Sequence, residues 1–189
     1  VGYNALGSGD SGGTNTAIGS GALGSATGYD NTAVGMIAGA NVTSGYNNLF
    51  LGHDAGITGS PGGNHVAANN NIVLGDENIA IFNAQVSLTV ASDERDKTDF
   101  TALDIGLDFV NDLKPYTYKW DKRSKYGDKT ADDYDLNAQT PDGTHKEDWL
   151  DIGFKAQEVE VLEKSAGYKI ADKTNLTTTL SQDGTQYGM

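Results

Sequence analysis

The chain has 189 residues, a formal net charge of −13 and no cysteine. This length allows one or two domains with a modest core, and the acidic balance argues against nucleic-acid partners, which need a basic surface. The missing cysteines exclude disulfides and thiolate-bound zinc, and the sequence contains no apolar run near about 18 residues, so we expect no membrane insertion.

Charge and glycine divide the chain into two unlike halves. Residues 1–91 contain 18 of the 25 glycines and no lysine or arginine, whereas all 13 basic residues lie in residues 92–189. We therefore predict two domains with a boundary between Ala91 and Ser92.

The first half contains an internal repeat of four short segments, each beginning with asparagine and ending with glycine. With an earlier copy at Val1-Gly2, the five glycines lie 17, 16, 17 and 23 residues apart. Such a short period predicts a solenoid in which each unit stacks on its neighbours. The segments are Asn15–Gly19, Asn31–Gly35, Asn48–Gly52 and Asn71–Gly75.

Each repeat is typical of β-structure: a short apolar strand followed by glycine, asparagine and serine turn residues. We expect Gly19, Gly35 and Gly52 to need either a positive φ or a close backbone approach. One thin coil of this composition buries little apolar surface. We therefore expect strands from several chains to share a core in a homotrimer.

The polar residues of the repeat have a structural and a functional interpretation. Asn15, Asn31, Asn48 and Asn71 are candidates for a ligand-binding ladder, but asparagine in a turn more often bonds its own backbone and tolerates left-handed geometry. His53 and His65 are candidate metal ligands, but the sequence offers no carboxylate or second histidine at a reliable spacing to complete a site. The sequence thus predicts neither a metal site nor any cofactor.

The second half has the pattern of a small α+β domain. The first half ends in alternating apolar residues that predict a strand near 78–91, and in the second half a capping-box-like Thr101–Asp104 predicts a helix that ends by Lys114, before Pro115. The remaining expected elements are a strand at 116–120, a surface loop at 121–148, a strand at 149–154, a helix at 155–167 closed by Gly167, and short strands in 168–189.

The repeat resembles two families of homotrimeric surface-recognition rods. One is the left-handed β-roll head of trimeric autotransporter adhesins, and the other is the Gly/Asn-rich repeat of phage tail fibres. The repeat alone does not choose between them.

Three motifs in the second half make that choice: "SDERDK" (92–97), "GLDFVNDLKPYTYKW" (106–120) and "IGFKAQEVE" (152–160). In this order they resemble the C-terminal intramolecular chaperone of phage tail spikes, tail fibres and endosialidases. The resemblance implies a domain that drives trimerisation and folding of the preceding β-fibre, then removes itself by autoproteolysis through a Ser–Lys dyad. It also implies a further C-terminal helical stretch, which this sequence does not contain.

Carried over residue by residue, the resemblance makes Ser92 the nucleophile and Lys97 the general base, with the cut between Ala91 and Ser92. Asp93 and Arg95 match the motif and are expected to position the scissile turn. Asp96 stands where the family often has leucine, and an acid there favours the charged form of the neighbouring lysine.

Chemistry and geometry set conditions on this dyad. Serine needs a base to take its proton, and lysine acts as one only after its pKa falls from about 10.4 towards 7. Residues five apart do not meet in a regular strand or helix. Either a turn folds between Ser92 and Lys97, or the pair forms across two subunits.

The leading interpretation is the distal part of a phage tail fibre, a mainly β trimeric solenoid or β-roll followed by a small α+β chaperone. It would be a peptidase in cis only. Its expected partners are its own copies, other tail proteins and a host cell-surface receptor such as a polysaccharide, and its expected location is the virion after synthesis in the host cytoplasm.

Two other interpretations are weaker. A trimeric autotransporter-like adhesin head without catalysis would not need the block from Ser92 to Glu160. A glycosidase would need paired carboxylates, and the first half offers five scattered acids. These are Asp10, Asp30, Asp54, Asp76 and Glu77.

Overall fold

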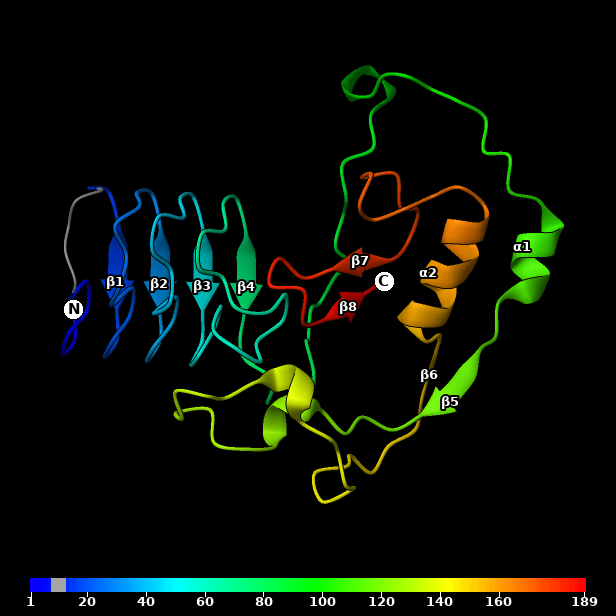
Figure 1. Cartoon of the computed structure of the whole chain (residues 1–189). Helices are drawn as coiled ribbons and strands as arrows, with labels where there is room; N and C mark the ends of the chain where they lie inside the picture. The colour runs from blue at the N-terminus through cyan, green and yellow to red at the C-terminus, as the bar shows by residue number, and fades with distance from the viewer. Residues whose placement is uncertain (8–12) are drawn as a thin grey trace.

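The first half of the chain forms one parallel sheet. The structure, a computed structural model, describes residues 1–7 and 13–189. Asp10 therefore lies outside the described residues. The sheet has four short strands, which lie side by side and are joined by loops (Figure 1). They are β1 (Thr16–Ile18), β2 (Thr32–Val34), β3 (Leu49–Leu51) and β4 (Ile72–Leu74).

The strand register pairs equivalent positions of the repeat. Ala17 pairs with Ala33, Ala33 with Phe50, and Phe50 with Val73, all in parallel. These partners are 16, 17 and 23 residues apart, the same intervals that separate the last four repeat glycines. Each copy of the repeat therefore contributes one strand to the sheet.

A small core lies on one side of this sheet. The middle residue of every strand points inward and is buried, whereas its two neighbours are exposed or half-buried. The alanines that follow the repeat glycines by three positions fill the space beneath: Ala22, Ala38 and Ala55 are fully buried. Small side chains at fixed offsets allow neighbouring repeats to pack closely. Phe50 is the largest fully buried side chain in the described part of the chain.

The prediction for the repeat glycines is confirmed. Gly19, Gly35 and Gly52 have φ values of 132°, 143° and 112°. A Cβ added to Gly35 would lie far inside van der Waals contact with the backbone carbonyl of Gly52, the equivalent residue of the next repeat. Both the conformation and the close approach therefore require glycine at these positions.

The repeat asparagines form a ladder that bonds from one repeat to the next. Asn31 Nδ2 donates to Asn15 Oδ1 at 3.1 Å, and Asn48 Nδ2 donates to Asn31 Oδ1 at 2.9 Å. The predicted bonding to local backbone is found for Asn71, whose Nδ2 donates to the Asn69 carbonyl at 2.7 Å, but not for the other three. Those side chains bond across the stack, and the left-handed conformation belongs to the preceding residues, including Asp30 and Asn47. Parallel in-register stacking explains this, because it brings equivalent side chains together.

The second half contains two antiparallel strand pairs and two helices. Strand β5 (Tyr116–Tyr118) pairs with β6 (Asp151–Gly153), and β7 (Thr179–Leu180) pairs with β8 (Tyr187–Gly188). The long loop between β5 and β6 contains the 3₁₀ turns η2 (Arg123–Lys125) and η3 (Leu136–Ala138). The two helices are α1 (Leu107–Asp112) and α2 (Ala156–Ser165).

Most elements predicted after residue 77 are found in shorter form, and two predictions are wrong. Residues 78–91 form no strand, because no other described segment pairs with them. Helix α1 begins at Leu107 rather than near Thr101, and its N-cap Gly106 offers no side-chain cap. Leu107 and Val110 of this helix are largely exposed, so no packed surface supports a longer helix.

Polar contacts join the two halves. The Lys122 ammonium donates to the Glu77 carbonyl at 2.8 Å, and the Lys129 ammonium pairs with the nearly buried Glu77 carboxylate. The backbone N–H of Asn64 donates to Asp183 Oδ2 at 2.6 Å. Among the described helices, none is long and apolar enough to cross a membrane.

Candidate functional site

The two residues predicted to form the dyad lie in contact within one chain. Lys97 Nζ is 2.6 Å from Ser92 Oγ and 3.2 Å from the Ser92 carbonyl oxygen. Between them the chain makes the 3₁₀ turn η1 (Glu94–Asp96), which reverses its direction. The structure therefore brings Ser92 and Lys97 together by a turn within one chain, rather than across two subunits.

The turn is held by Asp93 and Arg95, the other two residues of the motif. Asp93 Oδ1 accepts from the Arg95 backbone N–H at 2.9 Å, and its two oxygens accept from Arg95 Nε and Nη2 at 3.0 and 2.6 Å. These hydrogen bonds lower the pKa of Asp93 and raise the pKa of Arg95. Asp93 thus caps the turn and neutralises Arg95 rather than facing the Lys97 amine.

The contact between Lys97 and Ser92 allows proton transfer in either direction. A charged ammonium donates to the serine hydroxyl, whereas a neutral amine accepts the hydroxyl proton over the same short separation. Only the second form acts as a base.

The whole segment around the predicted cut is exposed. Ala91, Ser92 and Lys97 belong to an uninterrupted exposed stretch from residue 78 to residue 104. All large apolar side chains of residues 79–90 are also exposed. Phe82, for example, is 71% exposed, and Leu88 is 88% exposed. Within one described chain, therefore, nothing shields the site from water.

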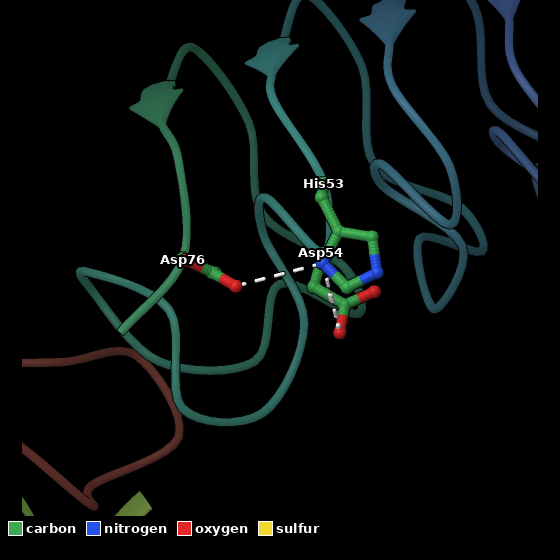
Figure 2. A group of neighbouring side chains, drawn as sticks. All are labelled: His53, Asp54 and Asp76. Carbon is green, nitrogen blue, oxygen red and sulfur yellow. Dashed lines mark ion pairs between the residues drawn. The ribbon is translucent and has the colours of Figure 1, made fainter. Parts of the chain in front are cut away.

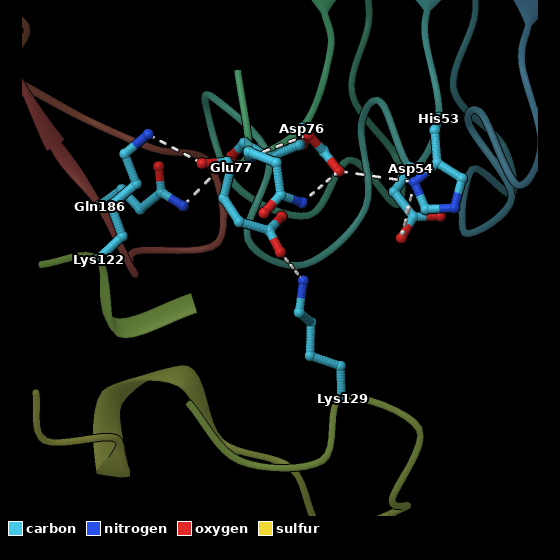
Figure 3. Close-up of polar contacts among 9 residues, drawn as sticks. His53, Asp54, Asp76, Glu77, Lys122, Lys129 and Gln186 are labelled. Carbon is cyan, nitrogen blue, oxygen red and sulfur yellow. Dashed lines mark hydrogen bonds and ion pairs between the residues drawn. The ribbon is translucent and has the colours of Figure 1, made fainter. Parts of the chain in front are cut away.

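A second cluster of functional groups lies at the end of the sheet. Figure 2 shows the His53 ring between two carboxylates, with Nδ1 3.6 Å from Asp54 Oδ2 and 3.5 Å from Asp76 Oδ2. One ligand atom from each residue lies within 4.8 Å of the others. Figure 3 shows that Asp76 is followed by Glu77, which Lys122 and Lys129 contact from the second half.

The electrostatics of the two carboxylates differ. Burial raises the pKa of Asp54, and the nearby His53 offsets part of this effect. Burial alone would also raise the pKa of Asp76, but hydrogen bonds from the backbone and side chain of Asn78 outweigh it and hold that pKa below its usual value. Asp76 is therefore the more stable anion of the pair.

Sequence reasoning missed this cluster, although the repeat contains the signal. His53 and Asp76 each directly follow a repeat glycine, Gly52 and Gly75. In a parallel stack with equivalent register, residues at equivalent positions lie side by side. Comparing equivalent positions of successive repeats, rather than neighbours along the chain, therefore finds the Asp76 carboxylate beside His53. His65 lies elsewhere, buried against Phe50.

Comparison with known proteins gives one family. No curated protein matches this chain, and no solved structure matches it. Residues 92–168 match the family described as "Chaperone of endosialidase". The matched segment begins at Ser92 and runs through Lys97, β5, β6 and α2. The match supports a chaperone domain of this family in the second half of the chain.

Proposed function

We propose that this chain is the distal part of a phage tail fibre or spike: a homotrimeric β-roll rod whose C-terminal chaperone drives trimerisation and folding and then cuts itself away between Ala91 and Ser92. The observation that carries the proposal is the 2.6 Å contact between Lys97 Nζ and Ser92 Oγ at the first residues of the matched family segment. The rod would then attach the virion to a host surface receptor, for which a polysaccharide is the expected class.

The proposed cleavage proceeds in two steps. Neutral Lys97 takes the Ser92 hydroxyl proton while Oγ attacks the Ala91 carbonyl carbon. The Ala91–Ser92 C–N bond then breaks, the Lys97 ammonium returns the proton to the departing Ser92 nitrogen, and Ala91 is left as an ester on Oγ. Water hydrolyses this ester, which frees the Ala91 carboxylate and restores the Ser92 hydroxyl. One water is consumed, and the chain acts once.

Trimerisation supplies what the single chain lacks. The amine of Lys97 must lose water before it can act as a base, and the site is exposed in one chain. The adjoining residues 79–90 carry exposed apolar side chains in an alternating pattern, as a strand awaiting a partner would. Packing of residues 79–90 against neighbouring copies would bury this segment and, at the same time, shield Lys97 from water. Cleavage would then follow assembly.

The intact mass of the purified protein, measured beside Ser92→Ala, tests the proposal. We expect two fragments that meet between Ala91 and Ser92 in the wild type and a single intact chain in Ser92→Ala. Ser165→Ala is a matched control, because it removes an exposed serine hydroxyl away from the site and should leave the fragments unchanged. An uncut wild-type trimer would contradict the peptidase role, and a wild-type monomer would contradict the trimeric rod.

A further inference from the structure

The cluster at the end of the sheet joins two successive repeats. His53 and Asp54 follow β3, and Asp76 follows β4, one residue after Gly75. Leu51 pairs with Leu74, so the chain reaches His53 and Asp76 two residues later on both strands. Their side chains therefore meet at the same end of the sheet (Figure 2).

The two separations from His53 to the carboxylates are close to those between ligands of one ion. The distances of 3.6 and 3.5 Å from His53 Nδ1 to the two carboxylates are longer than ordinary hydrogen bonds. Two ligands bound at about 2.0–2.2 Å with a tetrahedral angle between them lie roughly 3.3–3.6 Å apart. These two separations thus suit an ion between the residues, and all three ligand atoms already lie within 4.8 Å of one another.

Two further contacts indicate that the carboxylates are prepared for a cation. Asp54 Oδ1 is buried and has no hydrogen-bond partner among the described residues. Asp76, whose side chain is only 9% exposed, is held in place by Asn78 N–H to Oδ1 at 2.9 Å and by Asn78 Nδ2 to Oδ2 at 2.8 Å. Hydrogen bonds of this kind orient metal-binding carboxylates, and a buried unpaired oxygen is costly without a positive partner.

We propose that His53 Nδ1, Asp54 and Asp76 bind one divalent transition cation, with Zn²⁺ the best fit. Two carboxylates and a neutral imidazole balance the charge of a divalent ion. One nitrogen with two oxygens suits Zn²⁺ or Co²⁺, whereas Ca²⁺ prefers six or more oxygens. The His53 side chain is 53% exposed, which leaves the fourth position open to water.

A cation at this site would link β3 to β4, the two strands separated by the longest interval of the repeat. The 23-residue step between β3 and β4 carries a larger loop than the other two. A cation held by both ends of this step would tie β3 to β4 beyond their few hydrogen bonds. All three ligands precede the proposed cut at Ala91, so the site would remain with the rod whether or not the chain is cleaved.

Cobalt titration of the metal-free full chain tests the site, because tetrahedral Co²⁺ has a strong visible spectrum. We expect one Co²⁺ per chain, displaced by Zn²⁺, and at least about 100-fold weaker binding in His53→Ala and Asp76→Asn. His145→Ala removes an exposed imidazole from the second half and should bind normally. Asn78→Ala should weaken binding by about 10-fold to 100-fold, because it leaves all three ligands but frees the Asp76 carboxylate.

Thermal unfolding separates a lost site from a misfolded variant. Zn²⁺ should raise the Tm of the wild type and His145→Ala but not of His53→Ala, while the far-UV circular dichroism of the metal-free proteins stays the same. Absence of a tetrahedral Co²⁺ spectrum in the wild type, or an unchanged spectrum in His53→Ala, would overturn the proposal. Neither result depends on cleavage at Ala91, so a failure here leaves the proposed peptidase intact.

Discussion

The carboxylate of Glu163, near the end of α2, accepts five hydrogen bonds from residues 176–178. Among them are the Thr177 N–H at 2.9 Å and the Thr178 hydroxyl at 2.6 Å. The side chain is fully buried, which alone would raise its pKa, but these bonds outweigh the burial and bring the pKa to about 2. Glu163 therefore attaches the segment that leads into β7 to the end of the helix.

This pKa makes the contribution of Glu163 dependent on pH. Because the folded pKa lies below the usual value of 4.5, the stabilisation is complete above about pH 4.5 and is lost as the pH falls towards 2. We expect Glu163→Gln to lower the free energy of unfolding by about 3 kcal/mol at pH 7, with the difference from wild type shrinking below pH 4.5. Urea unfolding at several pH values measures it. Glu94→Gln, which changes an exposed carboxylate, is the control. A difference in unfolding free energy between wild type and Glu163→Gln that did not change with pH would contradict a stabilising role for the Glu163 charge.

The asparagine ladder makes a second prediction about single residues. The Asn31 side chain is fully buried, donates to the Gly45 carbonyl at 2.8 Å and accepts from both nitrogens of Asn48. Asn31→Ala leaves these buried groups without partners, so we expect a loss of about 2–4 kcal/mol in unfolding free energy. Asn41→Ala, which removes an exposed contact with Asn64, should cost under about 1 kcal/mol. Equal losses in the two variants would show that the ladder adds nothing.

Between neighbouring strands, the repeat depends on glycine. Gly35 combines a φ of 143° with backbone contact to Gly52, so Gly35→Ala introduces both strain and a clash. Gly184 has a φ of 72° but no atom within 4 Å of an added Cβ, so Gly184→Ala introduces the strain alone. We expect losses of roughly 3 kcal/mol or more and about 1 kcal/mol, respectively. Chemical unfolding followed by circular dichroism compares them, and similar losses would exclude the clash.

Elements with a local cause are predictable from this sequence, and those that depend on distant partners are not. The strands of the repeat follow from their apolar centres and glycine ends, and α2 follows from its amphipathic pattern and Gly167, whose φ is 93°. Residues 78–91 alternate like a strand, but pairing needs a second segment, which the described chain does not supply. The alternating pattern therefore indicates that residues 78–91 can pair in a sheet, but it does not indicate that they do so within one chain.

The candidate sites divide in the same way. Ser92 and Lys97 were identified by resemblance, and their contact depends on a turn whose cap, Asp93, is visible in the sequence only as part of a motif. His53 and Asp76 are 23 residues apart and meet only through the strand register. Composition and spacing along the chain do not reveal such a pair, but alignment of the repeats does.

For the whole molecule, contact of Ser92 and Lys97 within one chain predicts cleavage in cis even inside a trimer. Co-expression of Ser92→Ala chains with Lys97→Ala chains should yield mixed trimers in which no subunit is cut, because neither chain has both groups. Wild-type chains co-expressed with tagged Ser92→Ala chains should be cut, while the tagged chains remain whole. Mass spectrometry of each mixture distinguishes the chains. Fragments from the first mixture would show that the pair forms between subunits.

The polar junction between the halves has a consequence for what happens after the cut. The proposed scission lies in the exposed linker, whereas Glu77 with Lys122 and Lys129, and Asn64 with Asp183, lie elsewhere and do not depend on the peptide bond at Ala91. Cleavage would therefore produce a nicked complex of two polypeptides rather than a free rod at once. Because ionic contacts weaken as salt screens them, departure of the chaperone would be a separate, reversible dissociation that higher ionic strength favours.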